Sequence, residues 1–189
     1  MAVQPNKLRL QKLLEGLNRE LALNGSTLKG HRCKVSTIAA STSLGLSDSG
    51  GLFLLDATDE TAAVTITLPE LVSDFIGVTY TFAVIDPSDL GFLITTGDVT
   101  DTTGDMYIGY AMLGADQVGS TSNGAGGRML APAANDSVIH LDGNLANSGG
   151  EAGSTVKVTA VSASRWYVEA MILTDDADAT GAALFQNGS

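Results

Sequence analysis

The sequence has little of what catalysis and cross-linking require. It holds one cysteine and two histidines in 189 residues, and only 16% of its residues are charged. Because Cys33 stands alone, no disulfide can form within the chain, and stability has to come from packing or from association of subunits. No run approaches the roughly 20 apolar residues of a membrane-spanning helix, and residues 1–10 lack the pattern of a secretory signal. We therefore expect a protein that is made in the cytoplasm and binds no membrane.

What the sequence does contain is typical of β structure. It has 22 glycines and many threonines, serines and valines, a composition that favours strands joined by turns. Its length suits one main domain with an appendage better than two full-sized domains.

The net charge of −11 is divided very unevenly along the chain. Residues 1–34 hold seven basic and two acidic residues, a net charge of +5, whereas residues 35–189 hold three basic and nineteen acidic residues, a net charge of −16. Such asymmetry indicates an electrostatic partner for one of the two parts. An acidic body works against a nucleic acid, and the basic segment lacks the Trp or Phe usual in membrane-surface helices, so we expect a protein partner.

The first segment predicts a helix over residues 6–23. Its leucines recur at steps of three or four residues, which gathers them on one stripe of a helix, and its basic residues lie in the first turn or opposite that stripe. We therefore predict a basic helical arm, residues 1–34, whose partner-binding residues are Lys7, Arg9, Leu10, Lys12, Leu13, Leu14, Leu17, Arg19 and Leu21.

The remainder predicts a body of short strands. Residues 35–50 read as a connector with a possible strand at 35–38, and from residue 51 the apolar residues alternate with polar ones. We expect strands at 51–56, 64–68, 78–84, 91–96, 105–113, 136–142, 154–163 and 165–173. With no helical crossovers between them, these predict an antiparallel β-sandwich or barrel, jelly-roll-like, over residues 51–189, with an acidic C-terminal tail.

The sequence offers no constellation typical of an active site. His31 and His140 have no second histidine or cysteine at a three- or four-residue spacing, so we interpret His140 as an ordinary strand residue. Cys33 has basic neighbours, yet nothing in the sequence orients a base toward it. We therefore predict a protein that is not an enzyme and has no cofactor.

Calcium is the one ion for which the sequence holds candidate ligands. Asp98, Asp101 and Asp105 lie around Gly104 and could supply oxygens, although their spacing does not match an EF-hand loop. We interpret this group as a solvated turn and predict no metal site, with calcium binding as the alternative. A second acidic group, Asp56, Asp59 and Glu60, is a weaker candidate of the same kind.

Two blocks of the sequence resemble small β domains of tailed-bacteriophage particles. In the first, Gly51–Asp56 and Val64–Pro69 precede the strand Gly77–Val84; in the second, Gly153–Ala160 precedes Ser164–Ala170. The resemblance covers residues 51–173, and it implies a core containing Tyr80, Phe82, Trp166 and Val168.

The resemblance implies a virion structural protein, most like a head decoration (cement) protein. Such a protein would be made in the host cytoplasm, bind the major capsid protein at the capsid surface and form a homotrimer. The alternative is a tail, fibre or adhesin module that binds a host-surface glycan or protein through the loop at residues 114–131.

Overall fold

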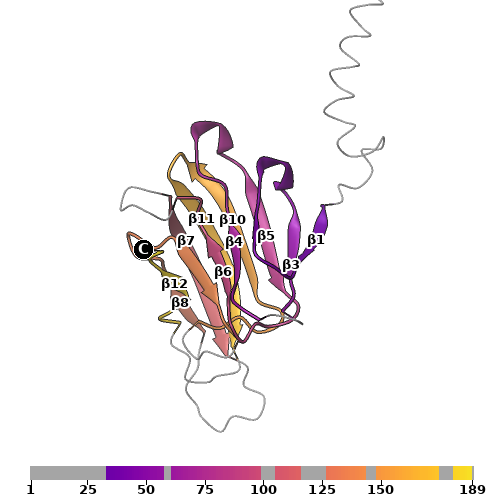
Figure 1. Ribbon diagram of the computed structural model, residues 1–189. Coiled ribbons are helices and arrows are strands. Elements are labelled where there is room, and N and C mark those ends of the chain that lie inside the picture. The colour runs from indigo at the N-terminus through magenta and orange to yellow at the C-terminus, as the bar shows by residue number, and fades with distance from the viewer. Residues whose placement is uncertain are drawn as a thin grey trace, which may run out of the picture. The chain divides into compact units, whose positions relative to one another are not determined.

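The protein is described by a computed structural model, which covers residues 33–57, 61–98, 105–115, 127–143, 148–174 and 181–188. The chain divides into two units, Met1–Cys33 and Lys34–Ser189, and every described strand belongs to the second (Figure 1). The predicted helix at residues 6–23 lies outside the described residues. No helix in the described part of the chain has the length and apolar character needed to cross a membrane.

The second unit is mainly β, as predicted. Its strands are β1 (Val35–Ile38), β2 (Thr42–Ser43), β3 (Leu52–Leu55), β4 (Val64–Thr67), β5 (Thr79–Val84), β6 (Phe92–Thr95), β7 (Met106–Ala115), β8 (Arg128–Leu130), β9 (Val138–Leu141), β10 (Thr155–Ser162), β11 (Arg165–Thr174) and β12 (Phe185–Gln186). Two short 3-10 helices, η2 (Leu46–Asp48) and η3 (Ser73–Phe75), interrupt them. The segment expected as a connector, residues 35–50, contributes β1 and β2.

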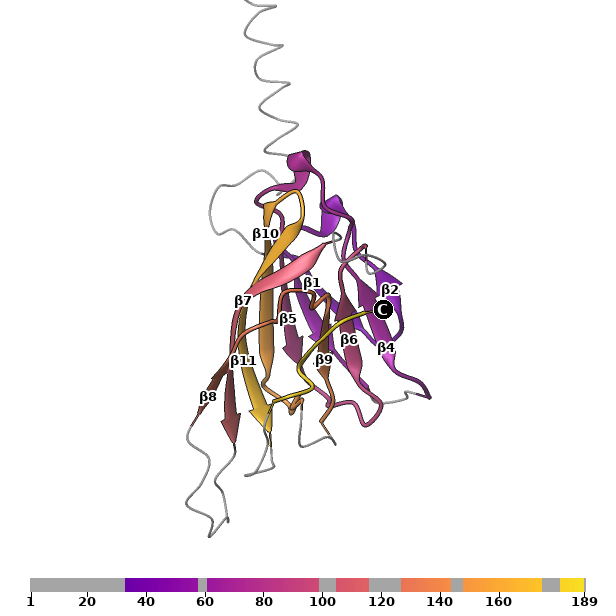
Figure 2. The ribbon, with the colours of Figure 1, turned by 90° about the vertical axis from the view of Figure 1, so that its left-hand side faces the viewer.

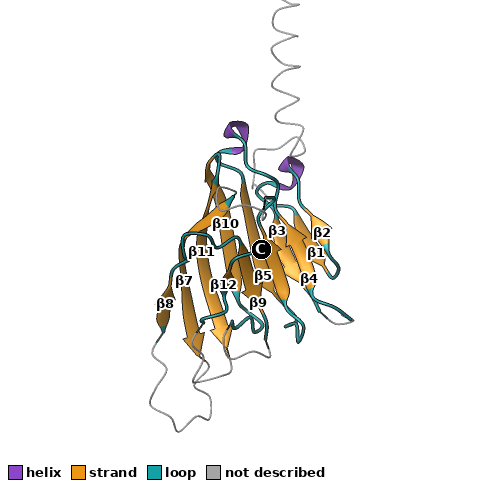
Figure 3. Ribbon diagram, turned by 60° about the vertical axis from the view of Figure 1, so that its left-hand side comes forward, coloured by secondary structure: helices purple, strands orange, loops and turns teal. Residues whose placement is uncertain are grey.

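The strands form two sheets, which lie in separate layers (Figures 1 and 2). The seven-stranded sheet has the order β1-β3-β5-β10-β11-β7-β8, and the five-stranded sheet has the order β12-β9-β6-β4-β2. Figure 3 shows that strands run through the whole described body and that the 3-10 helices lie in connecting segments.

The prediction that the sheets are antiparallel was wrong, because both sheets are mixed. Neighbours β1, β3 and β5 are parallel, and so are β2, β4 and β6 and the pair β7 and β11. The reason is the route of the chain. From β1 to β6 the chain alternates between the two sheets. After each strand it passes through one strand of the other sheet, and on its return it forms a new strand beside the earlier one and parallel to it. The opposite sheet thus supplies the crossover that a helix makes in βαβ folds.

One hydrophobic core collects side chains from both sheets. Successive side chains of a strand point to opposite faces, so Val64 and Ile66 of β4 point into the core, whereas Thr65 and Thr67 lie on the outer face. Burying an aliphatic or aromatic side chain of this size contributes about 1.5–3 kcal/mol. The aromatic residues named from the resemblance, Tyr80, Phe82 and Trp166, are all fully buried.

Candidate functional site

The arm predicted to bind a partner lies outside the described residues, so its nine residues stay a prediction. They are Lys7, Arg9, Leu10, Lys12, Leu13, Leu14, Leu17, Arg19 and Leu21. Nothing in the described residues tests their helical stripe or the basic face opposite it.

The calcium candidates are only partly described. Asp105 is 4% exposed, and its carboxylate accepts a hydrogen bond from the backbone N–H of Leu71 at 2.7 Å. Burial raises the pKa of Asp105, and that hydrogen bond opposes the rise. Asp101 lies outside the described residues, as do Asp59 and Glu60 of the second acidic group. Within the described ranges, no three His, Cys, Asp or Glu side chains come together in a way that could hold a metal ion.

His140 lies in β9, as expected for a strand residue, and helps to hold the C-terminal strand. Its Nδ1 lies 3.1 Å from Nε2 of Gln186 in β12, and its Nε2 lies 3.8 Å from a carboxylate oxygen of Asp142. The Gln186 amide nitrogen can only donate, so Nδ1 accepts and the ring is neutral. Burial lowers the pKa of His140, and the charge of Asp142 opposes this. These contacts fasten β12 to β9.

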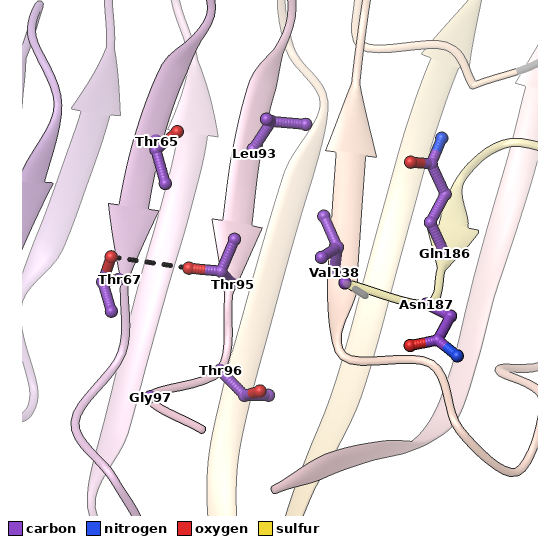
Figure 4. A pocket seen from close by; sticks show the side chains of 10 residues that line it. Thr65, Thr67, Leu93, Thr95, Thr96, Gly97, Val138, Gln186 and Asn187 are labelled. Carbon is purple, nitrogen blue, oxygen red and sulfur yellow. Dashed lines mark hydrogen bonds between the residues drawn. The ribbon is translucent and has the colours of Figure 1, made fainter. Parts of the chain in front are cut away.

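The outer face of the five-stranded sheet carries a shallow hollow of about 460 Å³. It follows one transverse register, in which Thr67, Thr95, Val138 and Gln186 lie opposite one another on β4, β6, β9 and β12 (Figure 4). The lining consists of hydroxyl, amide and small apolar groups without a charged side chain: Thr65, Thr67, Leu93, Thr95, Thr96, Gly97, Val138, Gln186, Asn187 and Gly188. Such a lining suits a neutral polar ligand.

The outer face of the seven-stranded sheet carries a row of methionines instead. Met112 of β7 lies opposite Met171 of β11 on one side and opposite Met129 of β8 on the other. Their exposed fractions are 45%, 54% and 73%, and Ile108 on the same face is 41% exposed. We call Met112, Met129 and Met171 the methionine row. Contiguous apolar surface of this kind typically marks a site of interaction.

Charge is distributed so that acidic residues avoid the strands. Glu169 in β11 is the one acidic residue in the twelve strands, and its carboxylate accepts from Nζ of Lys157 in β10 at 3.1 Å. All three basic residues of segment 35–189, namely Arg128, Lys157 and Arg165, lie in strands of the seven-stranded sheet. The face with the methionine row is therefore poor in acid, although the segment as a whole carries −16.

Sequence reasoning missed the methionine row because both the existence of β8 and the alignment of the three methionines depend on how the strands pair. Met129 falls in the stretch predicted as a loop at residues 114–131, where the structure has the three-residue β8. Met112 and Met171 fall in predicted strands, and alternation would have placed each on an outward face. Only the register of β7 with β8 and β11 brings the three together.

Comparison of the chain with protein families, with curated proteins and with solved structures finds no match.

Proposed function

We propose that the protein is a structural subunit of a tailed-bacteriophage particle, which decorates and cements the capsid by binding the major capsid protein. In this proposal the two layers of the body form a β-sandwich, several copies assemble as a homotrimer on the capsid surface, and the arm at residues 1–34 makes the attachment.

The observation that carries the proposal is the face with the methionine row. A shell protein needs broad surfaces for other proteins rather than a concave reactive site. The outer face of the seven-stranded sheet offers exposed Met112, Met129 and Met171, and its described strands hold a single, paired acid, Glu169. Methionine is enriched at protein interfaces and charged residues are depleted at their centres.

Two further arguments support the proposal. The first is the resemblance of residues 51–173 to β domains of phage particles. The second is the charge of the two segments, +5 for residues 1–34 against −16 for residues 35–189. An arm of opposite sign can bind an acidic neighbour that the body itself would repel. Repeated attachment around a symmetry axis then raises avidity without tight single contacts.

The test is reconstitution on capsids that lack the protein. Purified protein should sediment with the capsids in a fixed ratio to the capsid protein, and deletion of residues 1–24 should abolish this while the body stays folded. A matched control replaces Arg128 and Arg165, two body cations that do not pair with Glu169, by serine, and a companion variant replaces Lys7 and Arg9 in the same way. Only the companion should lose binding, and normal loading of the truncated protein would disprove the arm model.

The second candidate is a tail, fibre or adhesin module that binds a host-surface glycan. It is favoured by the uncharged hollow on the five-stranded sheet, where Thr67, Thr95 and Gln186 offer hydroxyl and amide groups. Labelling of intact particles separates the two candidates, because signal only on tails would support this one. Glycan binding that is lost with Thr67→Val and Gln186→Leu would locate the ligand in the hollow.

A further inference from the structure

We infer that the outer face of the seven-stranded sheet, centred on Met112, Met129 and Met171, is the surface through which copies of this chain contact one another. The inference deepens the proposed function and rests on its homotrimer, for which it names the interface. The partner is therefore another copy of the chain, and the methionine row lies near the symmetry axis.

The first argument is electrostatic. Copies that meet around a rotation axis bring the same residues together, so each unpaired charge near the axis meets its own kind. Segment 35–189 carries nineteen acidic and three basic residues, and it cannot offer a basic surface to match an acidic one. A contact between bodies is therefore confined to a face from which acids are absent or paired. Among the strand residues that the structure describes on this face, Glu169 is the single acid, and Lys157 neutralises it.

The second argument is the chemistry of the row. Three methionines on adjacent strands present flexible, polarisable side chains that can adapt to identical side chains of a neighbour. Their exposed fractions of 45% to 73% mean that the free subunit leaves a large part of each side chain in water. The described strands of the five-stranded sheet hold no acidic residue, but one register on their outer face holds Thr67, Thr95 and Gln186. Those groups are already well solvated and gain little from burial.

The third argument is area. Seven strands about 4.8 Å apart span about 29 Å, and strands of up to ten residues are up to about 33 Å long. The face therefore approaches the roughly 800 Å² that each partner contributes to a stable interface. The row itself covers only the part formed by β11, β7 and β8, so the neighbouring strands have to take part in the contact.

The experiment measures the mass of the full-length chain in solution by sedimentation equilibrium, with no capsid present. Wild-type protein should sediment as an oligomer of the 19.4 kDa chain. Met112→Lys should raise the dissociation constant at least about tenfold, because like charges then meet at the axis, and Met129→Lys should act in the same direction. Met112→Leu should retain the oligomer.

The matched control is Thr67→Lys, which adds the same charge to the outer face of the other sheet and should leave the oligomer intact. Far-ultraviolet circular dichroism and the fluorescence of buried Trp166 verify folding in each variant. A monomeric wild type, or variants at Met112 and Met129 that associate as the wild type does, would overturn the inference. A dimer sensitive to both variants would support the surface but contradict the homotrimer. Loss of capsid binding by an intact oligomer would count against the proposed function alone.

Discussion

The two sheets share one core, yet they turn very different surfaces to the solvent. The outward positions of the seven-stranded sheet include Met112, Met129 and Met171, whereas one register of the five-stranded sheet holds Thr67, Thr95 and Gln186. The inward positions of both sheets are apolar. Both sheets therefore have the same alternation of inward and outward residues. The identity of the outward residues alone gives the seven-stranded sheet an apolar surface suited to a protein contact and gives the five-stranded sheet a polar hollow. Four changes test this difference.

The largest effect is expected at Gly109 in β7, the strand next to the edge strand β8 of the seven-stranded sheet. Its φ is +121°, and a Cβ atom there would collide with the backbone of Val168 on β11. Gly109→Ala should therefore lower the free energy of unfolding by about 3 kcal/mol or more and disturb the pairing that aligns the methionine row. Gly50→Ala is the control, because Gly50 also has a positive φ, +77°, but open space around it. Urea denaturation should show a loss of only about 1 kcal/mol for the control, and equal losses would refute the steric argument.

On the five-stranded sheet, we expect the free energy of unfolding to depend on pH through His140. Burial lowers the pKa of His140 in the folded state below its unfolded value of about 6.5. The unfolded chain then binds the proton first, so stability holds above about pH 6.5 and falls as the pH drops toward the folded-state pKa. The slope from this group is at most about 1.4 kcal/mol per pH unit.

His140→Gln removes this titration and keeps an acceptor for the Gln186 amide. Denaturation curves between pH 5 and pH 8 should show a smaller loss of stability on acidification for the variant. If the curves of the two proteins run parallel, His140 does not titrate with folding.

Through Asp105, which lies immediately before β7, the free energy of unfolding should depend on pH in the opposite sense. Burial raises its pKa above the unfolded value of about 3.9, so the stability associated with the protonated carboxyl is lost as the pH rises through the folded-state pKa. Asp105→Asn keeps an oxygen acceptor for the Leu71 N–H and removes the buried charge. The variant should be more stable than wild type at pH 7 by up to about 1 kcal/mol. Wild type and variant should have equal free energies of unfolding below the unfolded-state pKa. A variant that is less stable than wild type at pH 7 would show that the carboxylate charge of Asp105 stabilises the folded protein.

The smallest effect is expected for the ion pair of Lys157 and Glu169. Both side chains are almost half exposed, 48% and 41%, and exposed pairs typically contribute between 0 and about 1 kcal/mol. A double-mutant cycle with Lys157→Ala and Glu169→Ala should give a coupling below about 0.5 kcal/mol that shrinks with added salt. A larger coupling would mean that this pair stabilises the body itself, beyond neutralising the face.

Local pattern predicted the strands well, and the reason is visible in β4 and β5. The alternation from Val64 to Thr67 and from Thr79 to Val84 separates buried from outward residues without regard to the neighbouring strand. The very short strands β2, β8 and β12 escaped prediction. Two or three residues carry no period, and those strands exist because a partner strand offers free backbone groups.

The candidate sites depended on information that no local pattern holds. Thr67 and Gln186 are 119 positions apart in the sequence, yet the registers of β4, β6, β9 and β12 place them along one hollow. The acidic cluster at Asp98, Asp101 and Asp105 was conspicuous in the sequence. In the structure Asp105 is buried and accepts a hydrogen bond from Leu71 of a distant segment.

The sequence by itself determined the longer strands, the side chains that these strands send into the core and the division of the charge, because these follow from composition and from a period of two. The tertiary structure alone decided the direction of the strands, their register and therefore the methionine row. Parallel pairing arises from a chain that alternates between two sheets, and a row across β8, β7 and β11 exists only once those strands, distant in sequence, have been paired.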